Sequence, residues 1–222
     1  PVVGVVPYMQ ISLEDEDSLT TRFDARQEAA VDIAVIRFPR ISNFTDFNVF
    51  SGIPGVSLRY VTRACDLGTP DMVILPGTKN TIHDLLWMRQ NGLEAAILKL
   101  ADRRVPVWGI CGGFQMMGEW LVDEFAIESS YKGKIRGMGL FPVETEFEEE
   151  KVRTQTEGRF GELYGCFREL SGKKLTGYEI HMGRTKSREK EQPLCLLNAG
   201  ENTGVREVKG IPCGWNRKNL YG

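Results

Sequence analysis

Residues 107–115 read Val-Trp-Gly-Ile-Cys-Gly-Gly-Phe-Gln, and this stretch decides the fold. An apolar strand runs into Gly-x-Cys-x-Gly, and a segment of helical spacing follows. This is the nucleophile-elbow arrangement, in which a sharp strand-to-helix turn presents one side chain, here Cys111, at the carboxyl end of a sheet. Small neighbours are required because the turn strains the backbone of the central residue. A buried structural cysteine is the alternative, and the agreement of strand, glycines and helix disfavours it.

Apolar runs of strand length and segments of helical spacing alternate around this elbow. The strand-like runs cover 33–36, 56–61, 71–75 and 105–110, and the helical segments cover 81–91, 93–104 and 113–123. The alternation predicts an α/β fold with an open, mostly parallel sheet flanked by helices on both faces. In the second half, residues 140–147 and 176–182 predict extra strands, in an order that the pattern leaves open.

The elbow carries the groups that acyl transfer at a thiol requires. A helix N-terminus favours thiolate over thiol at Cys111, and the backbone N–H of Gly112 is placed to donate to an oxyanion. The segment 75–81, Leu-Pro-Gly-Thr-Lys-Asn-Thr, follows another predicted strand, so the N–H groups of Gly77 and Thr78 could complete the oxyanion hole. Its spacing does not fit a P-loop. Taken alone, the segment is also consistent with an ordinary strand-to-helix turn.

Composition narrows the class of protein. The 222 residues include 28 Lys+Arg and 30 Asp+Glu, and the net charge of −2 gives no electrostatic reason to expect nucleic acid or a membrane as a partner. No apolar stretch reaches the roughly 18 residues of a membrane span. The 5 cysteines form no C-x-x-C pair, so we expect no disulfide scaffold or zinc site and a cytoplasmic location. With 2 histidines, a His-rich metal site is excluded.

The motifs resemble those of class I, or triad, glutamine amidotransferases, whose Gly-x-Cys-x-Gly-x-Gln signature is matched by residues 109–115. The blocks 37–47, 75–81 and 177–185 are similar to those of the glutaminase domain in the cobyric acid synthase family. The resemblance covers nearly the whole chain and implies a flavodoxin-like fold. It also implies site roles: Cys111 as nucleophile, Gly77 and Gly112 as oxyanion donors, and Gln115, Thr78, Tyr178 and His181 as glutamine-binding residues.

The resemblance further implies an activity and partners. In that family the cysteine attacks the side-chain amide of L-glutamine, a glutamyl thioester forms, and ammonia is released. An N-terminal synthetase domain of the same polypeptide uses the ammonia, with ATP and Mg²⁺, to amidate corrinoid carboxylates in cobalamin biosynthesis. No cofactor is expected in the glutaminase domain itself.

Domain boundaries are expected on the same basis. Residues 1–28 resemble the end of the upstream synthetase domain and its linker. Residues 29–222 resemble the amidotransferase domain, which we expect to be truncated before its own C-terminus. The family's catalytic histidine sits in a Thr-Tyr-x-His-Gly block that would follow Gly222, and neither His83 nor His181 matches that block. His181 is the local candidate for a substitute base. We expect the 222-residue chain alone to be weakly active or inactive.

Three alternatives stay open at this stage. A cobyrinic acid a,c-diamide synthase-type domain shares the elbow, but the block 37–47 favours the cobyric acid synthase family. A silent docking module would not need a reactive thiol. A cysteine hydrolase of esters or peptides fits the elbow but does not account for Gln115 or the block 177–185. Within the block 37–47, Phe44 and Phe47 could pack, and Arg37 and Arg40 could face a partner domain.

Overall fold

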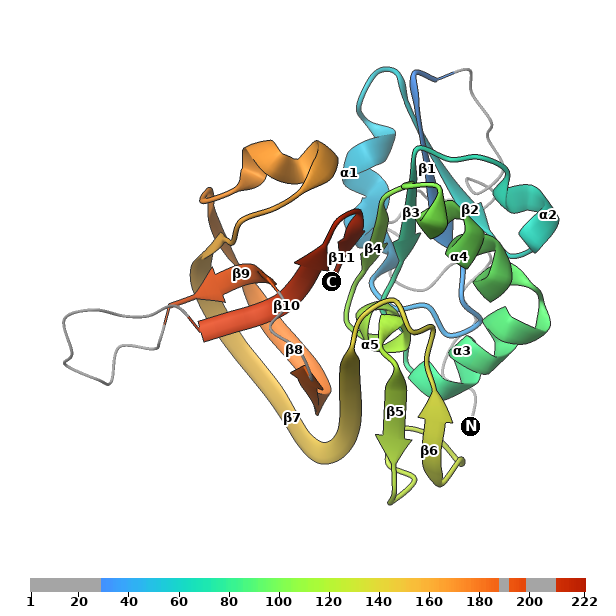
Figure 1. Ribbon diagram of the computed structural model, residues 1–222, viewed down its shortest axis with the longest axis vertical. Helices are drawn as coiled ribbons and strands as arrows, with labels where there is room; N and C mark the ends of the chain where they lie inside the picture. The colour runs from blue at the N-terminus through green and yellow to red at the C-terminus, as the bar shows by residue number, and fades with distance from the viewer. Residues whose placement is uncertain (1–28, 188–191, 199–210) are drawn as a thin grey trace, which may run out of the picture.

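The computed structural model describes residues 29–187, 192–198 and 211–222, and the strand and linker expected within residues 1–28 lie outside this range. Within the described part, eleven strands form one sheet in the order β2-β1-β3-β4-β11-β10-β9-β7-β5-β6, with β8 paired to β7 (Figure 1). The first five strands in this order, which are β2, β1, β3, β4 and β11, are all parallel. Their bounds are β1 Val31–Ile36, β2 Val56–Val61, β3 Met72–Leu75, β4 Val107–Gly109 and β11 Leu220–Tyr221.

The remaining strands extend this sheet and pair mainly antiparallel (Figure 1). The exception is β5, which lies parallel to β7. The long β7 and β8 form a hairpin that includes the 3-10 helix η3, Gly165–Leu170, in its connection. The bounds are β5 Trp120–Asp123, β6 Gly133–Arg136, β7 Val143–Phe160, β8 Lys174–Ser187, β9 Gln192–Leu197 and β10 Ile211–Arg217.

Helices cover both faces of the parallel part, as the alternating pattern predicts. Along β1, Ala34 and Ile36 belong to the core cluster under the larger helices, and Ile33 and Val35 belong to the cluster on the other face. This division follows from the two-residue period of a strand. One face carries the larger helices α3 Thr81–Gln90 and α4 Leu93–Asp102 together with the short α2 Ala64–Leu67. The other face carries η2 Phe44–Phe47 and α1 Asn48–Ser51.

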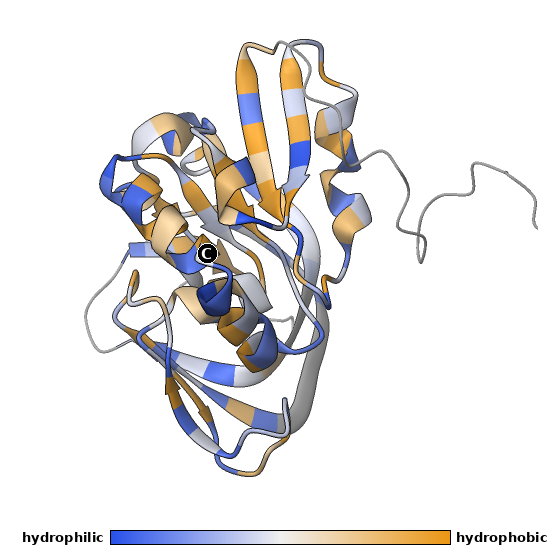
Figure 2. Ribbon diagram, turned by 90° about the vertical axis from the view of Figure 1, so that its right-hand side faces the viewer, coloured by the Kyte–Doolittle hydropathy of each residue, from blue (hydrophilic) through white to orange (hydrophobic). Residues whose placement is uncertain are grey.

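The edge strand β2 interrupts its apolar residues with Ser57 and Arg59, as β1 does with Asp32 (Figure 2). Arg59 is nevertheless buried, because its guanidinium pairs with Asp32 at 2.8 Å and donates to the Leu67 carbonyl at 2.5 Å. A buried cation needs such partners to offset its lost hydration. This ion pair holds β2 against β1 at the edge of the sheet, and both residues are distant in sequence from the elbow at Cys111.

The helix predicted over 113–123 is wrong in its second half. Helix α5 spans only Gly112–Met117, and β5 follows at Trp120. Gly118 adopts an extended conformation, and the N–H of Glu119 donates to the Val143 carbonyl at 2.8 Å. Sheet pairing with β7 therefore overrides local helical spacing. Of the strand predicted over 140–147, residues 143–147 belong to β7 and residues 140–142 precede it, whereas the strand predicted over 176–182 lies wholly within β8. Both observed strands are longer than expected.

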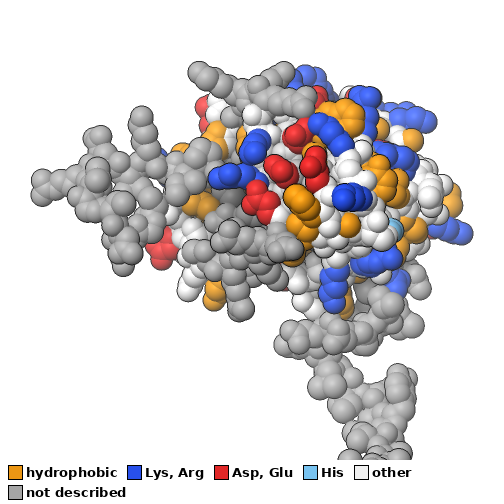
Figure 3. Space-filling view, turned by 90° about the horizontal axis from the view of Figure 1, so that it is seen from below, with side chains coloured by type: hydrophobic (Ala, Val, Ile, Leu, Met, Phe, Trp, Pro, Cys, Tyr) orange, Lys and Arg blue, Asp and Glu red, His pale blue; other side chains and the backbone are white. Residues whose placement is uncertain are grey.

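Seen from below, the surface carries acidic and basic side chains close together, with hydrophobic side chains scattered between them (Figure 3). Lys134 pairs with Glu144 at 2.5 Å, and Lys186 lies 3.6 Å from Glu146. Among the described residues, no helix is long and apolar enough to cross a membrane.

Candidate active site

Cys111 occupies the turn between β4 and α5. Its φ of 50° and ψ of −112° lie in a region that L-residues rarely adopt, as an elbow requires. The turn has no room for a side chain at Gly113, where a Cβ would overlap the carbonyl oxygen of Leu75. At Gly112 a Cβ would lie 2.8 Å from Thr78 Cγ2. Because Cys111 is exposed, its thiol is accessible to a substrate at the carboxyl end of the sheet.

The loop from Pro76 to Asn80, between β3 and α3, lies directly beside the elbow. A Cβ placed on Gly77 would be 3.8 Å from Cys111 Cβ, and one placed on Gly112 would be 3.4 Å from the Thr78 nitrogen. Within the described part of the chain, the backbone N–H groups of Gly77, Thr78 and Gly112 donate to no other group. Three unpaired donors therefore lie close to one thiol, which is the arrangement that an oxyanion hole requires.

One cavity of about 760 Å³ opens beside the thiol. It brings together five of the residues that the sequence singled out, and these are Gly77, Thr78, Cys111, Gln115 and Tyr178. Of the other two, Gly112 is buried next to Thr78, and His181 is described below. The expected grouping of the elbow, the loop and the block 177–185 is thus present in space.

Gln115 is buried one turn into α5, and its amide is held from two sides. Its Nε2 donates to the Met182 carbonyl at 2.9 Å, and its Oε1 accepts from the Thr81 hydroxyl at 3.4 Å. These contacts join α5 to β8 and to the start of α3. Gln115 therefore fixes the position of β8 at the cavity wall.

The block 177–185 contributes Tyr178 and Met182 to the cavity. Tyr178 keeps 68% of its surface exposed, so its ring stands at the mouth rather than in the core. His181 lies in β8 with its backbone opposite Val152. Its side chain lies outside the described part of the structure, so its expected contact with glutamine stays a prediction.

Residues 32–222 match the family described as "CobB/CobQ-like glutamine amidotransferase domain". The chain belongs to this family. It is 49% identical over 224 residues to a cobyric acid synthase from Ruminiclostridium cellulolyticum, covering 100% of the chain and 42% of that protein. It is 48% identical over 204 residues to a cobyric acid synthase from Lachnoclostridium phytofermentans, covering 90% of the chain and 39% of that protein. The chain thus spans about two fifths of the length of these relatives.

Solved structures support the same fold. The "Structure of PurLQS from Thermotoga maritima" matches with a TM-score of 0.59 at 18% identity, covering 86% of this chain and 85% of the other. A "glutamine amidotransferase" structure matches with a TM-score of 0.53 at 12% identity, covering 85% and 86%. The predicted α/β architecture and the resemblance to class I glutamine amidotransferases are confirmed.

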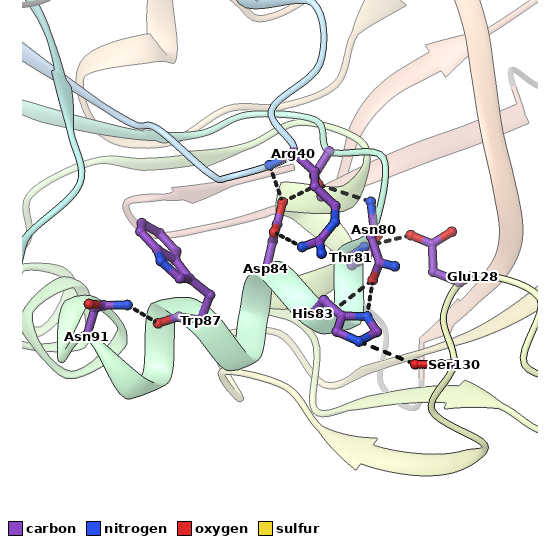
Figure 4. A network of polar contacts seen from close by, with 10 residues as sticks. Arg40, Asn80, Thr81, His83, Asp84, Trp87, Asn91, Glu128 and Ser130 are labelled. Carbon is purple, nitrogen blue, oxygen red and sulfur yellow. Dashed lines mark hydrogen bonds and ion pairs between the residues drawn. The ribbon is translucent and has the colours of Figure 1, made fainter.

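The cavity of this amidotransferase-family chain also contains a carboxylate that the sequence reasoning missed, Glu128. Its Oε1 accepts the backbone N–H of Thr81, the first residue of α3, at 2.6 Å (Figure 4). Burial raises the pKa of Glu128 above its usual value, and the nearby Asp123 and Asp84 add to the increase. Among the described residues, no cation forms an ion pair with Glu128.

Asp123 positions the loop that carries this carboxylate. It is fully buried, and its two oxygens accept the backbone N–H groups of Ile127 at 2.7 Å and of Glu128 and Ser129 at 3.1 Å each. An aspartate that caps several following N–H groups is a recurrent turn device. That spacing, from Asp123 to Ser129, is the one signal in the sequence that could have drawn attention to the loop.

The structure places His83 outside the cavity lining. Its backbone N–H donates to Asn80 Oδ1 at 3.0 Å, its Nδ1 lies 2.9 Å from the same oxygen, and its Nε2 lies 3.5 Å from Ser130 Oγ (Figure 4). His83 is therefore part of the cap of α3.

In the described ranges, no group of three or more His, Cys, Asp or Glu side chains is placed to hold a metal ion.

Proposed function

We propose that this chain is the glutaminase domain of a cobyric acid synthase. It hydrolyses L-glutamine to glutamate and ammonia, and a synthetase domain of the same polypeptide uses the ammonia to amidate corrinoid carboxylates. Support comes from the family match over residues 32–222 and from relatives that are cobyric acid synthases. ATP and Mg²⁺ would act in the synthetase domain.

One observation carries the proposal at the level of chemistry. The thiol of Cys111 shares a cavity with the unpaired N–H donors of the loop at Gly77 and Thr78. A thiol beside preorganised donors suits attack on a carboxamide, because the donors stabilise the negative oxygen that forms in the transition state.

The proposed reaction has two steps. The Cys111 thiolate attacks the side-chain amide carbon of glutamine, and the carbonyl oxygen becomes an oxyanion held by the N–H groups of Gly77, Thr78 and Gly112. Collapse of this intermediate breaks the carbon–nitrogen bond, and the amide nitrogen leaves as ammonia after it takes up a proton. Water then attacks the glutamyl thioester, which releases glutamate and restores the thiol.

Glu128 would recognise the α-ammonium group of the substrate. It is a partly buried carboxylate in the cavity that has one backbone donor and no described cation. A ligand cation would provide the missing charge, and glutamine carries one at its α-amino group. Gln115 and Tyr178 would form the adjoining walls, as the resemblance to the family implies, and His181 keeps that role as a proposal.

The general base is proposed to be the histidine of the Thr-Tyr-x-His-Gly block that the resemblance places after Gly222. Strand β11 is parallel to β4, and Gly222 packs against Phe114 of α5. A residue that follows Gly222 would therefore emerge at the same edge of the sheet as Cys111.

Labelling of the full-length protein with diazo-oxo-norleucine, a glutamine-analogue electrophile, tests this function. We expect one adduct, on Cys111, and we expect excess glutamine to prevent it. Cys65 and Cys166 are also exposed and serve as internal controls for unspecific alkylation. Equal labelling of these cysteines, or labelling that glutamine does not slow, would overturn the proposal.

A further inference from the structure

The segment 37–47, conspicuous in the sequence and without an assigned role, lies against the loop beside the thiol. Ile41 pairs with Thr78 as an isolated antiparallel bridge. The N–H of Ser42 donates to the Gly77 carbonyl at 2.9 Å, and the N–H of Lys79 donates to the Arg40 carbonyl at 2.9 Å. The two hydrogen bonds flank Thr78, so residues 40–42 pair with residues 77–79 in the manner of a short antiparallel strand.

This pairing fixes the direction in which Thr78 points its own N–H. The peptide between Gly77 and Thr78 is planar and trans, so its C=O and N–H point in opposite directions. Because the Gly77 carbonyl points toward Ser42, the Thr78 N–H must point away from the segment. The elbow lies on that side, since a Cβ on Gly112 would be 3.4 Å from the Thr78 nitrogen.

A single carboxylate ties the loop and the segment together. Asp84, in the first turn of α3, is fully buried and accepts hydrogen bonds from Arg40 (Figure 4). It also accepts a hydrogen bond from the Thr78 hydroxyl. Arg40 contributes both its backbone N–H and its Nη1, each at 3.2 Å. The Thr78 hydroxyl in turn accepts the N–H of Asn80 at 3.1 Å. Asp84 does not line the cavity, so it has no direct route to the substrate.

We propose that Asp84 is a positioning residue, which keeps the Thr78 N–H directed toward Cys111. Asp84 does so by fixing the loop 76–80 against the segment 37–47. This inference rests on the proposed glutaminase function. It gives Arg40 a role within the domain, and the partner-facing role considered from the sequence stays a prediction because part of the side chain is exposed. Burial of Asp84 without these donors would be costly, so the carboxylate and its partners maintain one loop conformation.

The test compares two reactions of the same thiol in the full-length protein. Glutamine hydrolysis needs the oxyanion donors, whereas alkylation of Cys111 by iodoacetamide is a displacement at carbon that creates no oxyanion. In Asp84→Asn, one carboxylate oxygen becomes an amide NH2, whose donors would face either Arg40 Nη1 at the Oδ1 position or the Thr78 hydroxyl and the Arg40 N–H at the Oδ2 position. The oxygen that remains is neutral, so the hydrogen bonds that it accepts are weaker than those to the carboxylate. We expect kcat for glutamine to fall by about tenfold to hundredfold, because loss of a full oxyanion donor costs about 10²–10³.

KM should change less than about threefold, and the alkylation rate less than about twofold, because neither depends on the oxyanion. Asp32→Asn is the matched control, since Asp32 also pairs with an arginine, Arg59, at 2.8 Å but lies at the edge of the sheet. It should leave both rates within about twofold of the wild type while it lowers stability.

Thr78→Val provides a second variant should Asp84→Asn fail to fold. It removes the hydroxyl that bonds Asp84 and leaves the contacts with Arg40, and it too should lower kcat without slowing alkylation. An unchanged kcat in the folded variants, or an equal loss of hydrolysis and alkylation, would overturn the positioning role. A wild-type protein that hydrolyses no glutamine would instead refute the proposed function.

Discussion

The backbone N–H of Thr81 donates to Glu128 Oε1 at 2.6 Å, which joins the first residue of α3 to a loop 47 residues later in the chain. The contact holds one oxygen of a partly buried carboxylate at the wall of the cavity that contains Cys111. Among the described residues, both the backbone N–H and the side chain of Thr81 interact with this carboxylate, and Asp123 fixes the loop beneath it. Our proposal for this carboxylate is that it binds a positively charged group of the ligand.

Glu128→Gln should weaken the binding of glutamine more than it slows the chemistry. A hydrogen bond to a charged group contributes about 1.5–3 kcal/mol, so KM should rise about tenfold to hundredfold with kcat changed much less. Steady-state kinetics of the full-length protein measure both values. Glu124→Gln, in the same loop and exposed, is the control and should behave as the wild type.

A substrate analogue makes this test specific. Glutaramate has the side-chain amide of glutamine and lacks the α-amino group, so the wild type and Glu128→Gln should process it equally poorly. If KM for glutamine stays within about twofold in Glu128→Gln, Glu128 does not recognise the ammonium group.

The raised pKa of Glu128 predicts a pH-dependent cost to stability. Burial raises this pKa in the folded protein, so the folded state binds the proton more tightly than the unfolded chain does. The contribution of the carboxyl to stability is then present at low pH and is lost as pH rises through the folded-state pKa. Glu128→Gln should therefore raise the melting temperature at about pH 8, and the gain should shrink toward about pH 4. A gain that is equal at both ends of this range would exclude a raised pKa as its cause.

Gly113→Ala should destabilise the elbow severely. A Cβ at this position would overlap the Leu75 carbonyl, and the backbone on both sides is part of the sheet and of α5, so neither can move aside cheaply. We expect a loss of about 3 kcal/mol or more, as is typical of overpacking at a backbone contact. Gly177→Ala, where a Cβ meets nothing within 4 Å, is the control and should change the free energy of unfolding by less than about 0.5 kcal/mol. Urea denaturation of both variants measures the difference, and equal stability would show that the elbow relaxes around the added carbon.

Much of the parallel sheet could be predicted because its signals are local. The apolar runs before Pro76 and Cys111 end at glycine-containing turns, so both the strands and the positions of their carboxyl ends follow from the sequence. Gly77, Thr78 and Cys111 meet in one cavity because the neighbouring parallel strands β3 and β4 deliver their loops to the same edge. Tyr178 reaches the cavity from within β8, which pairs antiparallel with β7.

The parts that could not be predicted depend on contacts between distant residues. The helical spacing of 113–123 extends across Gly118, and pairing of Trp120 with Glu144 on one side and with Arg136 on the other makes that stretch a strand. Glu128 follows Cys111 by 17 positions in a loop without regular spacing, so no pattern marks it as part of the site. Asp84 looks from the sequence like an ordinary acidic residue in the first turn of a helix. Its role depends on Arg40 and Thr78, which only the fold brings to it.

Replacement of Cys111 by alanine in the full-length protein tests the glutaminase role most directly. Corrinoid amidation is measured with glutamine and, separately, with ammonium salt as the nitrogen source. If Cys111 supplies ammonia to a synthetase domain, Cys111→Ala should lose amidation and glutamate formation with glutamine and keep amidation with ammonium. Glutamate formation from glutamine at the wild-type rate in Cys111→Ala would contradict this role.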